Sequence, residues 1–372
     1  MNVLVAMSGG VDSSVAAALL KEQGHRVLGA TLKLLRQETG FGCCGSTRDI
    51  DVARAVCAML GMPHYVLDFA NDFQKNILDP FVNSYLSGET PNPCIACNRF
   101  IKFDALLKKA VALGADAVAT GHYAQIDVRD ENGKSVRRLR RAVDPNKDQT
   151  YVLYHLGQAE LSQLVFPIGG MTKPEVRDAA RRFNLKTAEK DESMEICFVP
   201  NADTAGFIKS KGGGRSAPSL TAGPIKSLDG RVIGEHRGVA YYTRGQRSGL
   251  GLSIGRPAYV VDLDPATNTL FVGEDEETAS AEVEVREVVW SLGAPPSVPI
   301  RAAVQIRSRH VAAPAVLTPT AQGVHVRFDI PQRAVAPGQA AVFYDEDRVI
   351  GGGTLCRSVP VGRKETTNVD SL

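Results

Sequence analysis

The chain has 372 residues, more than the roughly 100 to 200 residues of a typical domain, so it predicts two or three domains that each bury a core. Its hydrophobic share of 44% is that of a globular protein, and no apolar run reaches the roughly 18 residues that a membrane span needs. The net charge of +2 excludes neither acidic nor basic partners, so charge has to be considered segment by segment.

The N-terminus leads directly into an apolar run, without the basic segment of a secretory signal peptide. The seven cysteines are an odd number, which argues for thiol chemistry or metal binding rather than for a framework of disulfides. We therefore expect a cytoplasmic protein that does not contact a membrane.

The first predicted elements are a strand over residues 3–6, a Gly-rich turn and a helix. Gly9 and Gly10 permit a tight turn, and the hydroxyls of Ser8 and Ser13 join amides at a helix start, where the helix dipole favours anions. The turn lacks the Gly-Lys-Ser/Thr ending of a Walker A loop and the three-glycine spacing of a dinucleotide fingerprint. This pattern predicts a phosphate-binding loop of another kind.

Strands and helices alternate through the first 200 residues, with predicted strands over 27–32, 64–67 and 117–120 and predicted helices over 50–60, 73–86 and 105–113. The alternation predicts an α/β fold, a doubly wound parallel sheet whose functional loops lie at the carboxyl ends of the strands. Leu32, Gly121 and His122 lie at such ends. They are candidates for ligand contacts, although a core leucine and a turn histidine are the simpler interpretations.

Residues 88–99 form a segment in which two prolines prevent regular pairing, so we expect an ordered loop that presents its side chains. Cys94 and Cys97 have the CxxC spacing of redox or metal sites. No second CxxC follows that could close a zinc site, so the partner should be a single distant cysteine. Cys197 fits that requirement, whereas Cys57 lies on an apolar helix stripe and is expected to pack in the core.

A basic run lies on a predicted hairpin, whose tip at Asn132-Gly133 joins strands over 124–128 and 135–141. Five of the residues in 134–141 are lysine or arginine, a density that suits contact with a polyanion but equally a solvated strand. Further along, Thr172 and Glu175 form a capping box that predicts the start of a helix.

The character of the sequence changes near residue 201, where flexible Gly-rich segments and short strands replace helical periodicity. In the last part, Gln305, Arg307 and Arg309 share one strand face that could meet nucleic acid, although exposed arginines often only solvate a sheet. We expect a catalytic domain over residues 1–200, a small central β-rich domain over 201–280, a C-terminal antiparallel β-barrel over 281–362 and a polar tail over 363–372.

Four blocks of the chain resemble, in order and spacing, the bacterial tRNA-specific 2-thiouridylases, a branch of the ATP pyrophosphatases. They are Ser8-Gly-Gly-Val-Asp-Ser13, Asn92-Pro-Cys-x-x-Cys-Asn98, Gly121-His-Tyr123 with Lys147-Asp-Gln149, and Ile196-Cys-Phe198. Residues 337–344 are also similar to that family, so the resemblance covers nearly the whole chain. One departure is Cys94, since many members of the family carry Asp there.

The resemblance implies an adenine-nucleotide α-hydrolase-like N-terminal fold and an ATP-dependent 2-thiolation of the wobble uridine of tRNA. ATP would cap the C2 oxygen as an adenylate, and sulfur would then expel AMP. ATP and Mg²⁺ are the implied cofactors, and a sulfur donor such as a cysteine desulfurase is an implied partner. ATP contacts are implied at Ala6, Met7, Ser8, Gly9, Gly10, Val11, Asp12, Ser13, Leu32 and Gly121.

The same resemblance implies that Cys197 receives a persulfide and that Cys97 assists sulfur release, which leaves a transient disulfide between them. Asp12 with magnesium would neutralise charge on the departing pyrophosphate. Contacts to tRNA are expected at Asn92, Pro93, Cys94, His122, Lys147, Asp148, Gln149, Arg307, Ser308 and Gln339, where His122 is added from its place beside the crevice.

Alternatives remain at the level of the sequence. Cys94, Cys97 and Cys197 with one open position could ligate a four-iron, four-sulfur cluster, whereas tetrahedral zinc lacks a fourth ligand nearby. An AMP-forming amide synthetase would use the same loop, and a redox or RNA-binding module with vestigial ATP binding would use the same surfaces. The two cysteine loci and the appended basic β domains favour the tRNA enzyme.

Overall fold

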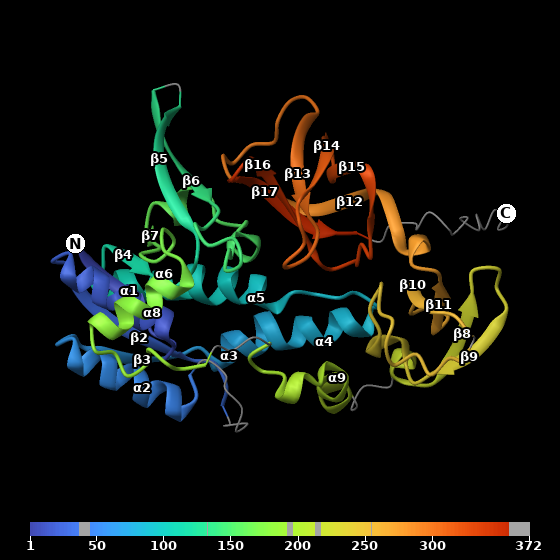
Figure 1. The fold of residues 1–372 in the computed structure, drawn as a ribbon, viewed down its shortest axis with the longest axis horizontal. Coiled ribbons are helices and arrows are strands. Elements are labelled where there is room, and N and C mark those ends of the chain that lie inside the picture. Colours follow the sequence, from blue (N-terminus) through green and yellow to red (C-terminus); the bar gives the residue numbers. More distant parts are fainter. Residues whose placement is uncertain (37–44, 132, 192–195, 213–216, 254, 357–372) are drawn as a thin grey trace.

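The computed structural model describes residues 1–36, 45–131, 133–191, 196–212, 217–253 and 255–356. Three parts follow one another along the chain: a parallel sheet covered by helices, a small four-stranded sheet and a β-barrel (Figure 1). The expected polar tail over 363–372 lies outside the described residues.

The N-terminal part is built on a five-stranded parallel sheet in the order β3-β2-β1-β4-β7. Because β2 and β4 pair with opposite edges of β1, the chain direction across the sheet reverses at β1, and a ligand crevice is expected outside the carboxyl ends of β1 and β4. The predicted doubly wound parallel sheet is confirmed. Its strands are β1 (Asn2–Ala6), β2 (Arg26–Lys33), β3 (His64–Asp68), β4 (Ala117–Ala119) and β7 (Leu164–Val165).

Helices cover both faces of this sheet because alternate residues of β1 point to opposite sides. Val3 and Val5 join one buried cluster and Leu4 joins the other. The first face is covered by α1 (Val11–Glu22), α2 (Thr47–Met59) and α8 (Lys173–Arg182), and the second by α3 (Ala70–Phe73), η1 (Gln74–Leu78), α4 (Asp79–Leu86) and α6 (Leu106–Ala112).

The segment predicted as a loop over 88–99 is helical from Pro93 onward, so that prediction was wrong in its second half. Asn92 caps the helix α5 (Pro93–Ala96) by accepting a hydrogen bond of 3.0 Å from the Cys94 amide. The π-helical η2 (Cys97–Ala105) then continues into α6. Proline is tolerated here because the first helical position needs no N–H donor.

Two local predictions are confirmed. The hairpin forms from the antiparallel strands β5 (Gln125–Glu131) and β6 (Lys134–Arg140), and β6 also pairs with β17 of the barrel. The capping box begins α8, where Thr172 and Glu175 bond each other. Shorter helices are η3 (Thr150–Val152), α7 (Gln158–Leu161), η4 (Pro200–Ala202), α9 (Thr204–Gly212), η5 (Pro218–Leu220), η6 (Val239–Tyr241) and η7 (Glu276–Thr278).

The second sheet has the order β10-β11-β8-β9 and packs around Ile225, Val260 and Leu270, which are fully buried. Its strands are β8 (Gly223–Ser227), β9 (Val232–His236), β10 (Tyr259–Asp264) and β11 (Thr269–Gly273). In Figure 1 this sheet lies on the opposite side of the barrel from the β5–β6 hairpin.

The C-terminal part is the predicted antiparallel barrel, closed because β12 pairs with both β15 and β17. Val324, Val326 and Phe328 point into its core, as the alternation along that strand predicted. The strands are β12 (Ala279–Trp290), β13 (Ile300–Gln305), β14 (Ala313–Thr320), β15 (Gly323–Arg333), β16 (Ala340–Asp345) and β17 (Arg348–Leu355). Within the described part of the chain, none of the helices combines the length and the apolar character required to cross a membrane.

Candidate active site

The predicted phosphate loop connects β1 to α1, the strand and helix at the centre of the first part. Gly9 has a φ of 71°, and a Cβ there would lie 2.7 Å from the carbonyl oxygen of Asp49, so the position requires glycine. Gly10 is the N-cap of α1 and offers no side chain to its first amides. Ser13 Oγ lies 3.2 Å from both the amide and the hydroxyl of Ser8, which closes the loop. The helix start therefore presents amides and hydroxyls of the kind that bind phosphate.

Gly121 follows β4 and packs against the start of α1. A Cβ on Gly121 would lie 2.7 Å from the Ser13 amide nitrogen, so glycine permits this close approach. Leu32 lies near the end of β2 with its side chain largely buried in the core. Met7 and Val11 are also buried, as residues of the core would be.

Asp12, in the first turn of α1, is held by two donors at the same oxygen. Its Oδ1 accepts from Lys173 Nζ at 2.7 Å and from Tyr123 Oη at 2.8 Å. On the other side of the loop, Lys190 Nζ donates to the Gly9 carbonyl at 3.0 Å and to Asp49 Oδ1 at 2.8 Å. Neither lysine is among the predicted site residues, because they lie 161 and 181 positions from Asp12 and Gly9 and carry no motif.

The cysteine segments come together although Cys97 and Cys197 lie 100 positions apart in the sequence. Both residues are half-buried and pack against the same apolar cluster. Cys94 lies on α5 with part of its surface open to solvent. Desolvation of its thiol, and then the nearby Cys197, raise its pKa, while Lys102 lowers it. Cys57 is buried on α2, where burial raises its pKa to about 12, as expected for a core thiol.

Among the residues that the structure describes, no three Cys, His, Asp or Glu side chains form a group that could hold a metal ion. As placed, Cys94, Cys97 and Cys197 therefore do not form the ligand set that an iron–sulfur cluster requires.

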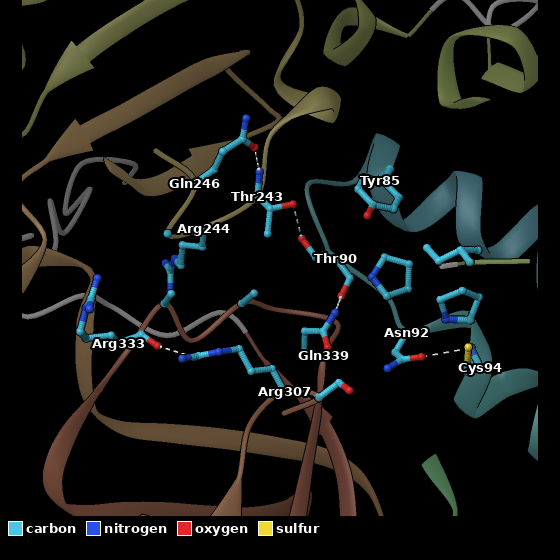
Figure 2. A pocket seen from close by; sticks show the side chains of 17 residues that line it. Tyr85, Thr90, Asn92, Cys94, Thr243, Arg244, Gln246, Arg307, Arg333 and Gln339 are labelled. Atoms are coloured by element: carbon cyan, nitrogen blue, oxygen red, sulfur yellow. Dashed lines mark hydrogen bonds between the residues drawn. The ribbon is translucent and has the colours of Figure 1, made fainter. Parts of the chain in front are cut away.

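A cavity of about 780 Å³ opens beside Cys94 where all three parts of the chain meet (Figure 2). The N-terminal part contributes residues 90–94 to the wall, and the central part contributes residues 243–246. The barrel contributes residues 307–308, 333–334, 336 and 339. Among the described residues that line the cavity, three are arginines and none carries a carboxylate; the arginines are Arg244, Arg307 and Arg333. Such a wall favours an anionic ligand.

Six of the predicted tRNA contacts line this cavity: Asn92, Pro93, Cys94, Arg307, Ser308 and Gln339. No ligand contact was predicted for the loop at residues 243–246 of the central part, because its Thr-Arg-Gly-Gln sequence is typical of many surface turns. Arg244 anchors that loop through a buried ion pair of 2.8 Å with Asp262 and a bond of 3.2 Å to the Val335 carbonyl of the barrel.

Arg307 and Arg333 are crowded at the barrel side of the cavity. Arg307 Nη1 donates to the Arg333 carbonyl at 2.9 Å, and burial together with the charge of Arg333 lowers the pKa of Arg307. Arg333 in turn forms an ion pair with Asp275. Two neighbouring guanidinium groups repel each other unless an anion lies between them, which makes this side of the cavity a candidate for phosphate.

The remaining predicted tRNA contacts do not line the cavity. His122 is buried against Phe103 and Phe166, and its Nδ1 lies 2.7 Å from Thr120 Oγ1. Burial, and then the charges of Lys102 and His155, lower its pKa well below the ordinary range. 

Residues 147–149 form hydrogen bonds that hold the turn after the hairpin in place. Asp148 accepts from Arg141 at 2.9 Å and from the Ala142 amide at 3.0 Å, and Gln149 Oε1 accepts from the Tyr123 amide at 2.9 Å. Lys147 lies in the same turn, where its amide donates to the Asp144 carbonyl.

The basic run of the hairpin is paired within the molecule. Arg138 and Arg140 both form ion pairs with Asp127, and Arg140 also pairs with Asp347 of the barrel. Arg141 lies over the ring of Tyr344 at 3.7 Å. These contacts neutralise much of the positive charge that the sequence analysis considered for binding a polyanion.

Comparisons with known proteins cover all three parts of the chain. Residues 1–201 match the family described as tRNA methyl transferase HUP domain, residues 215–274 the tRNA methyl transferase PRC-barrel domain, and residues 280–355 the Aminomethyltransferase beta-barrel domain. A solved NH3-dependent NAD synthetase from Campylobacter jejuni is 20% identical with a TM-score of 0.30, over 50% of this chain and 64% of that chain.

Curated relatives match nearly the whole length. The tRNA-specific 2-thiouridylase MnmA of Chloroflexus aurantiacus is 49% identical over 361 residues, 96% of this chain and 98% of that protein. Proteins of the same name from Carboxydothermus hydrogenoformans and Moorella thermoacetica are 49% and 47% identical, over 95% of this chain and 97% and 98% of theirs. With this identity over this length, the chain belongs to the family of tRNA-specific 2-thiouridylases.

Proposed function

We propose that this protein replaces the C2 oxygen of the wobble uridine of tRNA by sulfur, using ATP and releasing AMP and pyrophosphate. The observation that carries the proposal is the cavity in which Asn92 and Cys94 share a wall with Arg307, Arg244 and Arg333. A base can reach the thiol side of this cavity while its backbone phosphates meet the arginines.

The chemistry begins with activation, because a carbonyl oxygen is a poor leaving group. The C2 oxygen attacks the α-phosphorus of ATP, the bond from that phosphorus to the α,β-bridging oxygen breaks, and pyrophosphate leaves with the electron pair. The loop at Gly9 and Gly10 and the amide end of α1 stabilise the negative charge that develops on this group.

The sulfur step uses two thiols. The outer sulfur of a persulfide on Cys197 attacks C2, and AMP leaves with the former C2 oxygen. Cys97 thiolate then attacks the inner sulfur of Cys197, so the outer sulfur stays on the base and a Cys97–Cys197 disulfide forms. A thiol reductant restores both thiols with two electrons. Cys197 lies close enough to Cys94 to affect its pKa, and Cys97 begins η2 directly after α5, which supports this assignment.

Mg²⁺ fits the phosphate loop, since the Asp12 carboxylate and the Ser13 hydroxyl are the oxygen donors that this ion prefers. When bound there, it supplies charge neutralisation for the phosphates. The cysteines do not form a metal-binding group within the described residues, so no step of the proposal runs through an iron–sulfur cluster.

Sulfur has to come from outside the chain, so we also propose a protein donor, a cysteine desulfurase or a relay protein, that meets Cys197. As an enzyme of tRNA it would act in the cytoplasm. The divisions at residues 200 and 280 are proposed as domain boundaries, and the cavity then lies where the three domains meet.

The proposal is tested by mass analysis of tRNA nucleosides after incubation with ATP, Mg²⁺, bulk tRNA, cysteine and a cysteine desulfurase. We expect 2-thiouridine at the wobble position together with tRNA-dependent release of AMP. Cys97→Ser and Cys197→Ser should both be inactive, with a persulfide accumulating on Cys197 in the first. Cys57→Ser, a thiol buried on α2, serves as the matched control and should remain active. AMP release that ignores tRNA would instead favour a small-molecule ligase.

A further inference from the structure

Two ion pairs join α8 to α1, one at each end of α1. Lys173 Nζ lies 2.7 Å from Asp12 Oδ1 at the phosphate end, and Arg182 Nη2 lies 3.0 Å from Glu22 Oε2 at the far end. The exposed fractions differ: 10% and 30% for the side chains of the first pair, 56% and 48% for those of the second. The pair at the phosphate end is therefore the one withdrawn from solvent.

Several contacts fix Lys173 beside the phosphate loop. Its amide donates to Asp144 at 3.0 Å, and its ammonium lies 5.6 Å from the centre of the Tyr123 ring. The Tyr123 hydroxyl binds the same oxygen of Asp12 that Lys173 binds. The ammonium group is thus held at the end of α1 where a phosphate is expected to bind.

Lys190 approaches the loop at its other end. Its ammonium donates to the Gly9 carbonyl at 3.0 Å and to Asp49 at 2.8 Å, and the two side chains are 32% and 14% exposed. The segment from Gly9 to Asp12 is therefore bounded by one ammonium group at each end. The two lysines lie on different parts of the chain, α8 and the segment that follows it.

Stability alone is a weak reason for these pairs, because a buried ion pair is often no more stabilising than apolar residues of similar volume. The negative charge of the nucleotide is a better reason for these ion pairs. Two lysines and two aspartates leave the site near neutral, and the phosphates of ATP add several negative charges beside Asp12 and Asp49. Ammonium groups that exchange carboxylate for phosphate oxygens would offset that repulsion through charge-assisted hydrogen bonds.

We propose that Lys173 and Lys190 bind the β- and γ-phosphates of ATP and compensate the charge of pyrophosphate as it leaves. This inference rests on the proposed function and assigns two further residues to its first step. When the C2 oxygen attacks the α-phosphorus, the electron pair of the broken bond passes to pyrophosphate, and both ammonium groups face that charge. Asp12 and Asp49 hold the lysines in position before the nucleotide arrives.

The test compares AMP with inorganic pyrophosphate, each titrated into the full-length protein with Mg²⁺ in a calorimeter. In Lys173→Met and in Lys190→Met we expect the affinity for pyrophosphate to fall about tenfold or more, the effect of losing one charge-assisted hydrogen bond. The affinity for AMP, which lacks the β- and γ-phosphates, should stay within about twofold. Lys173→Arg keeps the charge and should retain much of the pyrophosphate affinity.

Arg182→Gln is the matched control, because it removes an ion pair between the same two helices at the end remote from the loop. It should leave both affinities unchanged. Equal losses for AMP and pyrophosphate in the lysine variants, or unchanged pyrophosphate binding, would overturn the assignment. Melting curves identify a variant that fails to fold. If Lys173→Met does not fold, the pyrophosphate affinities of Lys190→Met and Lys173→Arg decide whether the assignment stands. Wild-type protein that binds neither ATP nor pyrophosphate would overturn the proposed function itself.

Discussion

Gln339 donates its side-chain amide to the main-chain carbonyl of Thr90 at 2.9 Å and so ties the barrel to the segment that leads to Asn92 and Cys94 (Figure 2). Thr90 also donates its amide to the Pro337 carbonyl at 2.7 Å. Its hydroxyl donates to that of Thr243 in the central part at 3.2 Å. The position of this segment is therefore set by both β parts of the chain, and Gln339, predicted to touch tRNA, holds the segment in place.

We expect Gln339→Ala to raise the KM for tRNA about two- to tenfold, the range that corresponds to one lost neutral hydrogen bond. Because the residue positions Thr90 and does not neutralise a phosphate, the salt dependence of tRNA affinity should be unchanged. Steady-state thiolation and binding at several salt concentrations measure the two quantities. Gln163→Ala, on an exposed turn, is the control. A shallower salt dependence in Gln339→Ala would contradict this role and indicate that Gln339 contacts a tRNA phosphate directly.

Arg307 should contribute to the salt dependence of tRNA binding, since it lies close to Arg333 in a cavity lined by three arginines. In Arg307→Gln we expect the slope of log affinity against log salt to fall by about 0.7, the value for one contact to single-stranded phosphate. Arg301→Gln removes an arginine that is paired with Asp329 on the same barrel and should leave the slope unchanged. Equal slopes in the wild type and in Arg307→Gln would show that Arg307 only solvates the surface. Arg138 and Arg140 should contribute less, because Asp127 already pairs with both.

Asp12→Ala should abolish tRNA-dependent release of pyrophosphate while leaving tRNA affinity nearly intact. The reason is spatial: Asp12 lies at the start of α1, and the arginine-lined cavity is formed by other segments. Pyrophosphate release and filter binding measure the two effects separately. Asp51→Ala, which removes an exposed carboxylate paired with Arg54 on α2, should change neither. A parallel loss of tRNA affinity in Asp12→Ala would contradict this separation of functions.

Cys94→Asp should keep most of the thiolation activity in air. Desolvation of its thiol and the neighbouring Cys197 raise the pKa of Cys94, which lowers its thiolate fraction and disfavours a role as nucleophile. The measurement is the yield of 2-thiouridine per enzyme, with the metal content of anaerobically purified wild type as a second readout. Colourless, iron-free and active protein is expected. A brown preparation with about four irons per chain would establish a cluster and contradict the persulfide relay.

Two histidines should make the fold sensitive to acid: His122, which is buried, and His155, whose ring nitrogens are shielded from water. Burial and Arg99 lower the pKa of His155 to about 3, and both of its ring nitrogens are buried with no hydrogen-bond partner among the described residues. Burial also lowers the pKa of His122. The unfolded chain binds protons near pH 6.5 that the folded chain does not, so stability is complete above that pH and is lost as the pH falls below it.

The expected loss is at most about 1.4 kcal/mol per pH unit for each histidine, measured by urea unfolding between pH 7.5 and 5.5. His155→Phe keeps a ring beside Phe103 and Tyr154 and should make the pH dependence of the free energy of unfolding shallower. An unchanged dependence in that variant would place the effect elsewhere.

The sequence by itself determined the features that depend on neighbouring residues. The phosphate loop, the strand–helix alternation, the hairpin at Gly133, the capping box at Thr172 and the alternation along β15 all follow from local backbone chemistry and short-range periodicity. The exception is the segment after Asn92, where two prolines predicted a loop and the chain forms a helix, because a proline at the first helical position also fits that pattern.

Only the tertiary structure decided which distant groups meet. Lys173 and Lys190 reach the phosphate loop from more than 160 positions away, Thr243 joins the cavity from the central part, and Arg140 is neutralised by Asp347 of the barrel. None of these pairs has a spacing that a helix or a strand imposes, so no periodicity in the sequence predicts them. Their contacts depend on how the three parts pack, and packing rests on side-chain shape and buried charge summed over the whole chain.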